Sequence, residues 1–537
     1  MQDVDDPRQE PAQRPSGPAH APAPGAPFRQ PARPQRVAVI GAGITGLATA
    51  FRLERAHPAW EVVVFEAEPR VGGKARTTVR DGYTVDWGPN GFLASAPETL
   101  ELVRELDLDE ALQPAADSAR RRYLYRDGGL RPLPASPPAF LASEVVPLRG
   151  RLRAALEVVL AHSASGEESV HAFLARHFGG VFADALADAF VSGITAGDAR
   201  ELSVDALFPR LRALEREHKS LVRGLIAQQR AARRDRAARA ADAPRPGPAA
   251  PSGRLTSFRG GGMQRLADAL HAALAGEVRV GTRVAGLEPL GDGRGYRLRL
   301  AGGAPPRPSR SGAAGRTEPE TGGASGGASG GADGPPAETF DDAFDDVVLT
   351  VPANAAAALL KAHLPAAAEA LAAIPYAGVR VFGLGFDRID VPRALDGFGF
   401  LVPRGQGVRS LGVLWTSSLY PERAPAGKVL LRVLAGGRLD PAMLELDDAA
   451  ALASVRRDLR LSMGITVEPA FVEAVRWPRA IPQYTLGHAE RLRTIEGALE
   501  ALPGVHLAGN AYRGVGVNDC VREAVRVAGL LSGEGAT

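Results

Sequence analysis

The chain has 537 residues, 45% of them hydrophobic, so it is long enough for two or three domains and a sizeable core. Its 64 basic and 61 acidic side chains leave a formal charge of only +3, which argues against a nucleic-acid-binding surface spread over the whole molecule. A single cysteine, Cys520, excludes an internal disulfide and a cysteine-rich metal site, and we interpret it as a packed apolar side chain, with a reactive thiol as the alternative. No apolar run reaches the roughly 18 residues of a spanning helix.

Residues 1–35 are rich in Pro, Ala, Gln and Arg, lack the apolar block of a secretory signal and are predicted to form a disordered leader. The stretch RVAVIGAGITGLATAFRLERAHPAWEVVVFEAE then predicts strand, helix and second strand, ending at Glu66. Gly41 suits the tight turn, Gly43 the approach of a pyrophosphate and Gly46 close helix packing, while Glu66 can accept from a ribose diol. We therefore predict a nucleotide site that also contains Ala42, Ile44, Thr45 and Ala67. A glycine-rich turn without a ligand is the alternative, and it leaves Glu66 unexplained.

Strand-like and helix-like segments alternate in the first hundred residues and again from 255, which favours α/β architecture. From about 141 to 239 the pattern is mostly helical, and residues 210–239 carry nine arginines and Lys219 against three acids. This basic face is either a solvated helix or a surface attracted to anionic lipid headgroups or an acidic substrate. A Gly/Ala/Pro/Ser-rich insert at 301–338, between the strand-like YRLRL and FDDVVLTVP, is predicted to decorate a hairpin or β-connection.

The motif PRVGGKARTTVRDGYTVDWGPNGF carries Arg70, Gly72 and Gly73 and resembles the second phosphate-contacting stretch of flavin-dependent amine oxidases and their relatives. SFRGGGMQRLADALHAAL and EVRVGTRVAGLE continue the resemblance. It implies an α/β fold with a Rossmann-like FAD-binding domain of the amine-oxidase type, a mixed-sheet substrate domain and a helical membrane-associating insertion. The implied cofactor is FAD, one per chain and non-covalently bound. The implied contacts beyond the nucleotide turn are Gly73, Lys74, Gly88, Pro89, Asn90, Gly91, Val284 against the adenine, Trp477, Asn510, Val515, Gly516 and Val517.

By this resemblance the chain divides into segments that return repeatedly to the FAD-binding domain. The predicted segments are a leader at 1–35, FAD-binding parts at 36–114, 254–350 and 479–537, a helical membrane-associating or substrate-cap insertion at 115–239, a linker at 240–253 and a substrate-binding domain at 351–478.

Five further segments resemble oxygen-dependent protoporphyrinogen oxidase within that superfamily. They are RRYLYRDGGLRPLPASPPAFL, FVSGITAGDARELSVDALFPRLRALEREHKSL, GFGFLVPRGQGVRSLGVLWTSSLYPERAP, IPQYTLGHAERL and AGNAYRGVGVNDC. The resemblance implies that Arg122 pairs with a substrate propionate, with Arg121 as its rival. It also implies that the backbone of Gly193 and the side chains of Leu401, Leu414 and Leu434 pack on the macrocycle. Each leucine would otherwise be read as strand core.

The implied activity is the six-electron oxidation of protoporphyrinogen IX to protoporphyrin IX in heme biosynthesis. Hydride transfer to flavin N5, repeated three times with reoxidation by O2, would give hydrogen peroxide, and no side chain is assigned as a general acid or base. The last helix would direct its N-terminus at the flavin N1–C2=O edge, with Asn518 and Asp519 as helix-start groups. A coproporphyrinogen III oxidase forming coproporphyrin III, a non-catalytic flavin-binding scaffold and an amine oxidase are the alternatives.

The resemblance also bears on partners and location. We expect a cytoplasmic chain that makes peripheral contact with the inner face of the cell membrane through its helical insertion. The resemblance also allows two protein partners, a second copy of the chain in a homodimer and a ferrochelatase that receives the product. No metal and no nucleic acid are expected.

Overall fold

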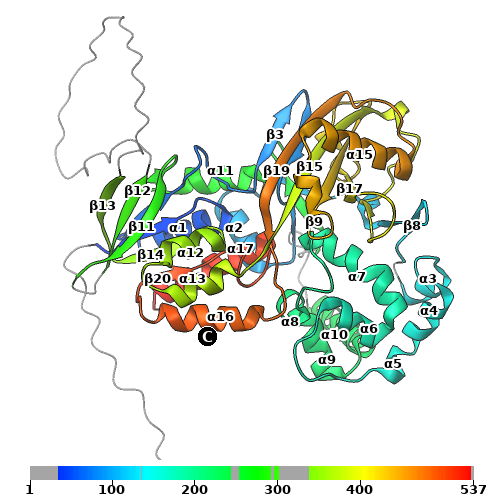
Figure 1. Cartoon of the computed structure of the whole chain (residues 1–537), viewed down its shortest axis with the longest axis horizontal. Coiled ribbons are helices and arrows are strands. Elements are labelled where there is room, and N and C mark those ends of the chain that lie inside the picture. Colours follow the sequence, from blue (N-terminus) through cyan, green and yellow to red (C-terminus); the bar gives the residue numbers. More distant parts are fainter. Residues whose placement is uncertain (1–33, 135, 243–252, 292–294, 302–337, 534–537) are drawn as a thin grey trace, which may run out of the picture.

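The computed structural model describes residues 34–134, 136–242, 253–291, 295–301 and 338–533 (Figure 1). Almost all of the predicted leader and of the 301–338 insert, and most of the 240–253 linker, lie outside the described residues. Figure 1 shows three regions: a layered α/β region on the left, a strand-rich region at the upper right and a group of helices at the lower right.

The α/β region is built on a five-stranded parallel sheet in the order β10-β2-β1-β14-β20. Its strands are β10 (Val278–Arg279), β2 (Glu61–Phe65), β1 (Arg36–Ile40), β14 (Asp346–Leu349) and β20 (Val505–Leu507). The central strands are nearly continuous apolar runs because a parallel sheet is covered on both faces. Segments more than 300 residues apart thus become neighbours, as Ala38 pairs with Val63 on one side and Val347 on the other.

Helices cover both faces of this sheet (Figure 1). One core contains side chains of α1 (Ile44–Ala56), α2 (Pro97–Glu105), α11 (Gln264–Ala273) and α17 (Val517–Leu531). The other contains α12 (Ala353–Leu360), α13 (Pro365–Ala372), α16 (His488–Leu499) and an antiparallel sheet of β11 (Arg283–Pro289), β12 (Tyr296–Ala301) and β13 (Glu338–Phe344). Because Ala301 pairs with Glu338, the insert lies on a β-hairpin, as predicted.

The strand-rich region is a seven-stranded mixed sheet in the order β19-β15-β18-β17-β16-β7-β8, in which only β16 and β7 are parallel. Its strands are β19 (Phe471–Pro482), β15 (Tyr376–Asp387), β18 (Lys428–Gly436), β17 (Ser410–Trp415), β16 (Gly399–Leu401), β7 (Tyr123–Arg126) and β8 (Gly129–Pro132). One face packs on α15 (Asp448–Met463). The opposite face meets the segment at residues 83–87, because Tyr83, Val85 and Trp87 share a core with it.

Short elements join these two regions. They are the hairpin β3 (Thr77–Arg80) and β4 (Tyr83–Asp86), the sheet of β5 (Phe92–Leu93), β9 (Leu255–Phe258) and β6 (Leu112–Pro114), the helix α14 (Thr416–Leu419) and the 3-10 turns η1 (Asp109–Ala111), η2 (Asp117–Arg120), η3 (Arg388–Asp390), η4 (Pro421–Arg423) and η5 (Pro441–Leu444).

The helical group begins later than the start of the predicted insertion at residue 115, since residues 123–132 form β7 and β8 of the seven-stranded sheet. Its helices are α3 (Pro137–Ala142), α4 (Leu148–Ala155), α5 (Glu157–Leu160), α6 (Val170–Phe178), α7 (Gly180–Thr195), α8 (Val204–Leu207), α9 (Pro209–His218) and α10 (Leu221–Asp242). Within the part of the chain that the structure describes, no helix is long and apolar enough to cross a membrane.

Buried ion pairs hold the helical group together. Arg212, expected to contribute to an outward basic face, is instead buried and pairs with Asp205, Glu168 and Glu215. Glu215 lies on the same helix, but Asp205 and Glu168 come from two other segments, which a count of charges over residues 210–239 does not reveal.

Candidate functional site

The nucleotide turn leaves an open cradle at the start of α1. A Cβ on Gly46 would lie 1.9 Å from the Gly41 carbonyl oxygen, and one on Gly41 would lie 2.9 Å from Thr350 Oγ1. A Cβ on Gly43, by contrast, would meet no atom within 4 Å. Gly43 also gives α1 no side-chain cap, so the first-turn N–H groups are available to an anion, as a pyrophosphate requires.

Glu66 lies directly after β2, beside this cradle. Its carboxylate accepts hydrogen bonds from the backbone N–H groups of Ala42 and Glu68 at 2.8 and 2.9 Å. These bonds fix the carboxylate at the carboxyl edge of the sheet, where ligands of open α/β sheets bind. Ala67 follows it at the exposed edge.

The Arg70 to Gly73 turn packs against the nucleotide turn. Gly72 N donates to Ala42 O at 2.8 Å, and a Cβ on Gly73 would lie 3.5 Å from Gly43 Cα. Positive φ angles of 101° at Gly72 and 53° at Gly73 make this turn favourable for glycine. The two predicted phosphate-contacting stretches therefore share one surface.

Lys74 follows this turn and is largely buried. Its ammonium lies 5.4 Å from the centre of the Tyr376 ring, and burial lowers the pKa of Lys74 to about 8. An amine in this position gains from an anionic neighbour, because the charged form is otherwise poorly solvated.

Asn90 gives the clearest sign that a polar group belongs here. It is buried, and neither its side-chain oxygen nor its nitrogen has a hydrogen-bond partner among the described residues. Unpaired buried amides are costly, so a ligand with both donors and acceptors fits this position. Gly88 and Gly91 on either side are closely packed, since a Cβ would lie 2.0 Å from Lys74 O and 2.6 Å from Thr256 O, respectively. Pro89 lies in the same turn.

The end of the chain returns to the cradle through a tethered loop. The Tyr484 hydroxyl donates to Asn510 O and accepts from Gly514 N, both at 2.7 Å. Gly516 is the N-cap of α17, and Asp519 accepts from Gly516 N at 3.0 Å, consistent with a helix-start group. The loop brings Val515, Gly516 and Val517 to the start of the helix that packs on α1.

Cys520 lies one turn into α17 and packs against the core around α1. Burial raises the pKa of its thiol to about 11, so the thiolate is scarce at neutral pH. The packed apolar interpretation is thus preferred over a reactive thiol. Asn518 does not act as the predicted helix-start group, because its side-chain nitrogen donates to Leu93 O at 3.0 Å and its side-chain oxygen accepts no hydrogen bond from a described residue.

Two further predicted cofactor contacts lie on strands beside the turns, since Thr282 N, just before β11, donates to Glu66 O and Trp87 directly precedes Gly88. Val284 in β11 packs beside the second core, and Trp477 in β19 donates from Nε1 to Trp87 O at 3.1 Å. The tryptophan therefore links the seven-stranded sheet to the strand that leads into the Gly88 turn.

The predicted substrate residues share one face of the seven-stranded sheet. Leu401, Gly412 and Leu434 form one cross-strand row, while Gly399, Leu414 and Arg432 form the next. Residues paired across strands point to the same face, and here that face is opposite to the α15 core. Gly193 of α7 packs against this face, since a Cβ on it would lie 2.8 Å from a Leu401 methyl.

Arg122 and Arg121 differ sharply in their surroundings. Arg121 pairs with Asp396 at 2.7 Å, and Tyr123 donates to the same carboxylate, so both lie on one side of the strand. Arg122 between them points the other way, its guanidinium 5.0 Å from the Phe398 ring centre, and it makes no ion pair with a described residue. Of the two arginines considered for binding a substrate propionate, Arg122 is therefore the one available to an anionic ligand.

Sequence reasoning missed Arg432. It is a buried arginine between the predicted substrate leucines, and it donates from Nη2 to the Gly88 carbonyl at 2.7 Å. The signal that could have found it is one arginine inside the apolar strand KVLLRVLAG.

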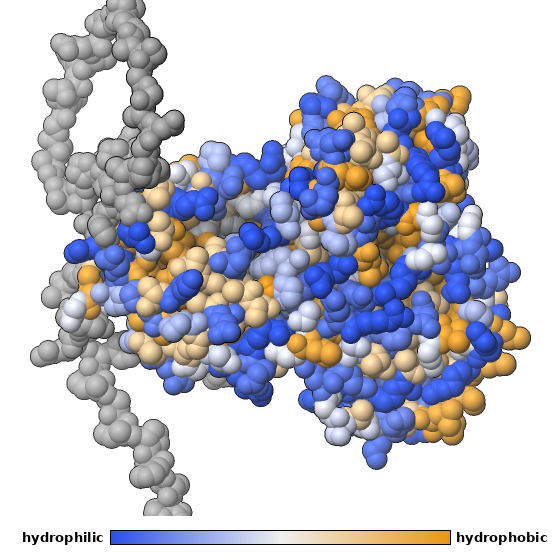
Figure 2. Space-filling view, in the orientation of Figure 1, coloured by the Kyte–Doolittle hydropathy of each residue, from blue (hydrophilic) through white to orange (hydrophobic). Residues whose placement is uncertain are grey.

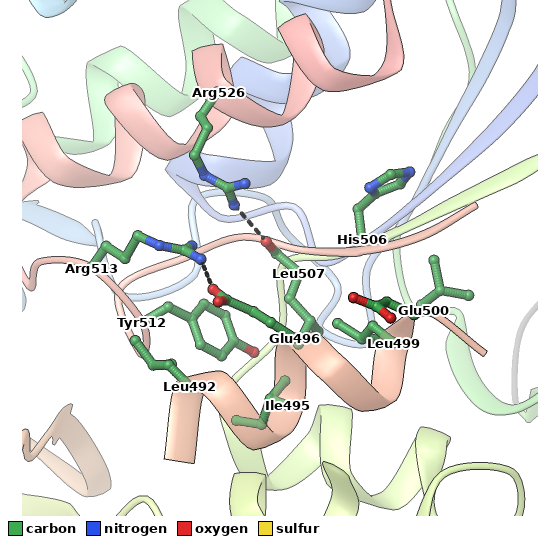
Figure 3. A pocket seen from close by; sticks show the side chains of 11 residues that line it. Leu492, Ile495, Glu496, Leu499, Glu500, His506, Leu507, Tyr512, Arg513 and Arg526 are labelled. Atoms are coloured by element: carbon green, nitrogen blue, oxygen red, sulfur yellow. Dashed lines mark hydrogen bonds and ion pairs between the residues drawn. The ribbon is translucent and has the colours of Figure 1, made fainter. Parts of the chain in front are cut away.

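A cavity of about 260 Å³ lies elsewhere, between α16, β20 and α17 (Figure 3). None of the predicted site residues lines it. Its two arginines are already engaged: Arg513 pairs with Glu496, and Arg526 pairs with Glu523 and donates to Leu507 O at 3.0 Å. This cavity does not contain the uncapped N–H groups found at the start of α1, and we do not assign the cofactor to it.

The chain is similar to known proteins over most of its length. Residues 44–532 match the family model described as flavin containing amine oxidoreductase, and the chain belongs to that family of flavin-dependent enzymes. A chloroplastic protoporphyrinogen oxidase of Nicotiana tabacum is 32% identical, covering 92% of this chain and 85% of its own. The coproporphyrinogen III oxidase of Bacillus subtilis is 29% identical over 91% of this chain and 96% of its own. A crystal structure from Exiguobacterium sp. 255-15, named for protoporphyrinogen oxidase, superposes with a TM-score of 0.72 at 25% identity, covering 93% and 99% of the two chains.

Proposed function

We propose that the chain oxidises a porphyrinogen to the corresponding porphyrin in heme biosynthesis, with FAD as a non-covalent cofactor, one per chain, and O2 as acceptor. The observation that carries the proposal is the apolar face of Leu401, Leu414 and Leu434, which Arg432 connects directly to the Gly88 turn. A wide aliphatic face beside a flavin, with a free arginine at its rim, suits a macrocycle edged by carboxylates. The names of the relatives from tobacco and Exiguobacterium support the same activity.

FAD, when bound, supplies the hydride-accepting and oxygen-reducing chemistry. The chain's own residues bind and orient: Arg122 pairs with a propionate, and the leucines pack on the ring and exclude water. The N-terminus of α17, which begins after Gly516, would favour negative charge on a flavin held beside it. We assign no general acid or base, because formation of the aromatic product supplies much of the driving force.

Protoporphyrinogen IX, the substrate that the sequence analysis prefers, and coproporphyrinogen III both suit this chemistry. Two relatives at about 30% identity, from Bacillus subtilis and Propionibacterium freudenreichii, are named for coproporphyrinogen III. The test is turnover of both porphyrinogens side by side, followed by porphyrin fluorescence. Anaerobic bleaching of the flavin by substrate separates an enzyme from a flavin-binding scaffold, and a chain that oxidises neither compound refutes the proposal.

A peripheral membrane contact is part of the proposal, on a surface that the sequence analysis did not single out. Apolar side chains are exposed along α4 and α5, and Figure 2 shows hydrophobic residues gathered at this lower right end of the molecule. The exposed fractions are 60% for Leu148, 57% for Leu152, 50% for Leu156, 76% for Val159 and 47% for Leu160. We call these five residues the α4–α5 ridge. Its spacing places one apolar stripe outward, as in helices that lie in a membrane interface.

A further inference from the structure

The buried guanidinium of Arg432 has no counter-ion. Among the described residues no carboxylate lies within ion-pair distance of it, and its Nε has no hydrogen-bond partner. The bond from Nη2 to Gly88 O satisfies one donor but does not neutralise the charge. Burial also lowers the pKa of Arg432 to about 10, which reflects how poorly this position solvates a cation.

Asp86, the acid whose charge acts on Arg432, is already engaged elsewhere. Asp86 pairs with the buried Arg423 at 2.5 Å and accepts further hydrogen bonds from Thr77 Oγ1 and Met263 N at 2.6 and 2.9 Å. Two buried arginines therefore face one buried carboxylate, and the group as a whole carries an excess positive charge. Such an excess is unfavourable unless an anion joins it.

The sheet register places a second cation on the same face. Arg432 of β18 pairs with Leu414 of β17, and Leu414 in turn pairs with Gly399 of β16. Arg122 lies one position before the paired residues Tyr123 and Phe400 in the neighbouring strand, which puts it at the other end of this row. Three strand spacings separate the two arginines, roughly 14 Å at the usual strand distance. Arg122 thus lies at the exposed end of this row of residues, and Arg432 lies at its buried end, beside the Gly88 turn.

We propose that Arg432 binds a second carboxylate of the porphyrinogen, at the edge of the macrocycle opposite the one that Arg122 binds. This inference rests on the proposed function and names its substrate class. Protoporphyrinogen IX has propionates on adjacent pyrroles only, so it offers carboxylates along one edge. Coproporphyrinogen III has a propionate on every pyrrole and can engage both arginines. The site therefore prefers coproporphyrinogen III.

The test compares FAD-loaded wild-type protein with Arg432→Met and Arg432→Lys. Loss of a charged hydrogen bond should raise the KM for coproporphyrinogen III by about tenfold or more in Arg432→Met, while the KM for protoporphyrinogen IX changes less than about twofold. Arg432→Lys, which keeps the charge, should recover part of the loss. Arg121→Met removes an exposed, paired arginine and should leave both KM values unchanged.

Flavin content and the midpoint potential of the bound flavin are measured on the same proteins. Equal KM changes for both substrates would mean that Arg432 only holds the Gly88 turn in place, and this result would overturn the proposal. A lower midpoint potential of the flavin in Arg432→Met, with an unchanged ratio of the two KM values, would mean that the arginine stabilises the reduced flavin. This result would also overturn the proposal. If Arg432→Met does not fold, the wild-type ratio of kcat/KM decides, because a preference for protoporphyrinogen IX contradicts two-edge binding. A wild-type chain inactive on both substrates would instead refute the proposed function.

Discussion

Gly43 and Gly46 of the nucleotide turn both lack a Cβ, but for different physical reasons. Both belong to the same motif, yet one faces open space and the other lies against backbone. Gly46 is where the chain packs on itself, whereas the open space at Gly43 is where we expect a ligand to approach. A pair of alanine substitutions at these positions therefore distinguishes binding from folding.

We expect Gly46→Ala to destabilise the apoprotein by about 3 kcal/mol or more, because its Cβ would overlap the Gly41 carbonyl oxygen. Gly43→Ala should cost less than about 1 kcal/mol, since Gly43 is an N-cap in extended conformation, but should weaken FAD binding. Thermal unfolding of apoprotein and flavin content after reconstitution measure the two effects. Equal destabilisation by both variants would contradict the assignment of the cradle.

We expect Lys74 to make cofactor binding depend on pH. Its pKa of about 8 lies below the ordinary value because the amine is desolvated, and a pyrophosphate favours the charged form. FAD affinity should be highest below pH 8 and fall as the lysine loses its proton, by up to about tenfold from pH 8 to 9. Titration of apoprotein with FAD at several pH values checks this. Lys74→Met should remove most of the dependence and the exposed Lys361→Met should not; a pH profile that survives in Lys74→Met sinks the idea.

Among the secondary-structure elements, α4 and α5 illustrate a limit of charge counting. The sequence directs attention to the basic run at 210–239, but Arg212 in that run is buried in ion pairs. The exposed ridge lies instead on α4 and α5, two short helices in which the apolar side chains are accompanied by three arginines and one glutamate. Apolar burial contributes more per residue to a surface-bound helix than an isolated basic side chain does.

A Leu152→Asn/Leu156→Asn double variant should reduce partitioning onto vesicles that contain anionic phosphatidylglycerol by at least about tenfold. Vesicle co-sedimentation measures this, with turnover in detergent as the check on folding. Leu461→Asn, at a similarly exposed leucine of α15, is the matched control and should bind vesicles as the wild type does. Unchanged partitioning of the double variant would remove the ridge from the membrane proposal.

At the scale of the whole molecule, the site exists only because distant segments meet. Strands β7 and β8 come from residues 123–132 but complete a sheet formed mainly by residues 376–482. This places Arg122 on the face that carries the three leucines, far along the sheet from the Gly88 turn. Substrate orientation should therefore depend on an arginine that the FAD-binding domain does not contribute.

Arg122→Met should raise the KM for either porphyrinogen by about tenfold, with kcat changed less than about threefold, because a carboxylate loses its charged partner outside the reacting bond. Arg121→Met should stay within about twofold, since the Arg121 to Asp396 pair is solvent-exposed. Steady-state kinetics with both substrates give the values. A larger effect at Arg121 would reverse the assignment of the propionate anchor.

Local patterns in the sequence determined the strand-helix-strand unit, its glycines, the family and the hairpin that carries the insert, because these depend on neighbouring residues and on short-range geometry. The substrate leucines could be named only by resemblance, since an apolar strand residue looks the same on either face of a sheet. Only the tertiary structure decided which of the two rim arginines is unpaired, and that Arg432 is buried without a counter-ion. Both answers depend on partners such as Asp396 and Asp86, which folding brings near or commits elsewhere. Charge balance in a protein interior is a property of three-dimensional neighbours, so it cannot be read from the order of residues along the chain.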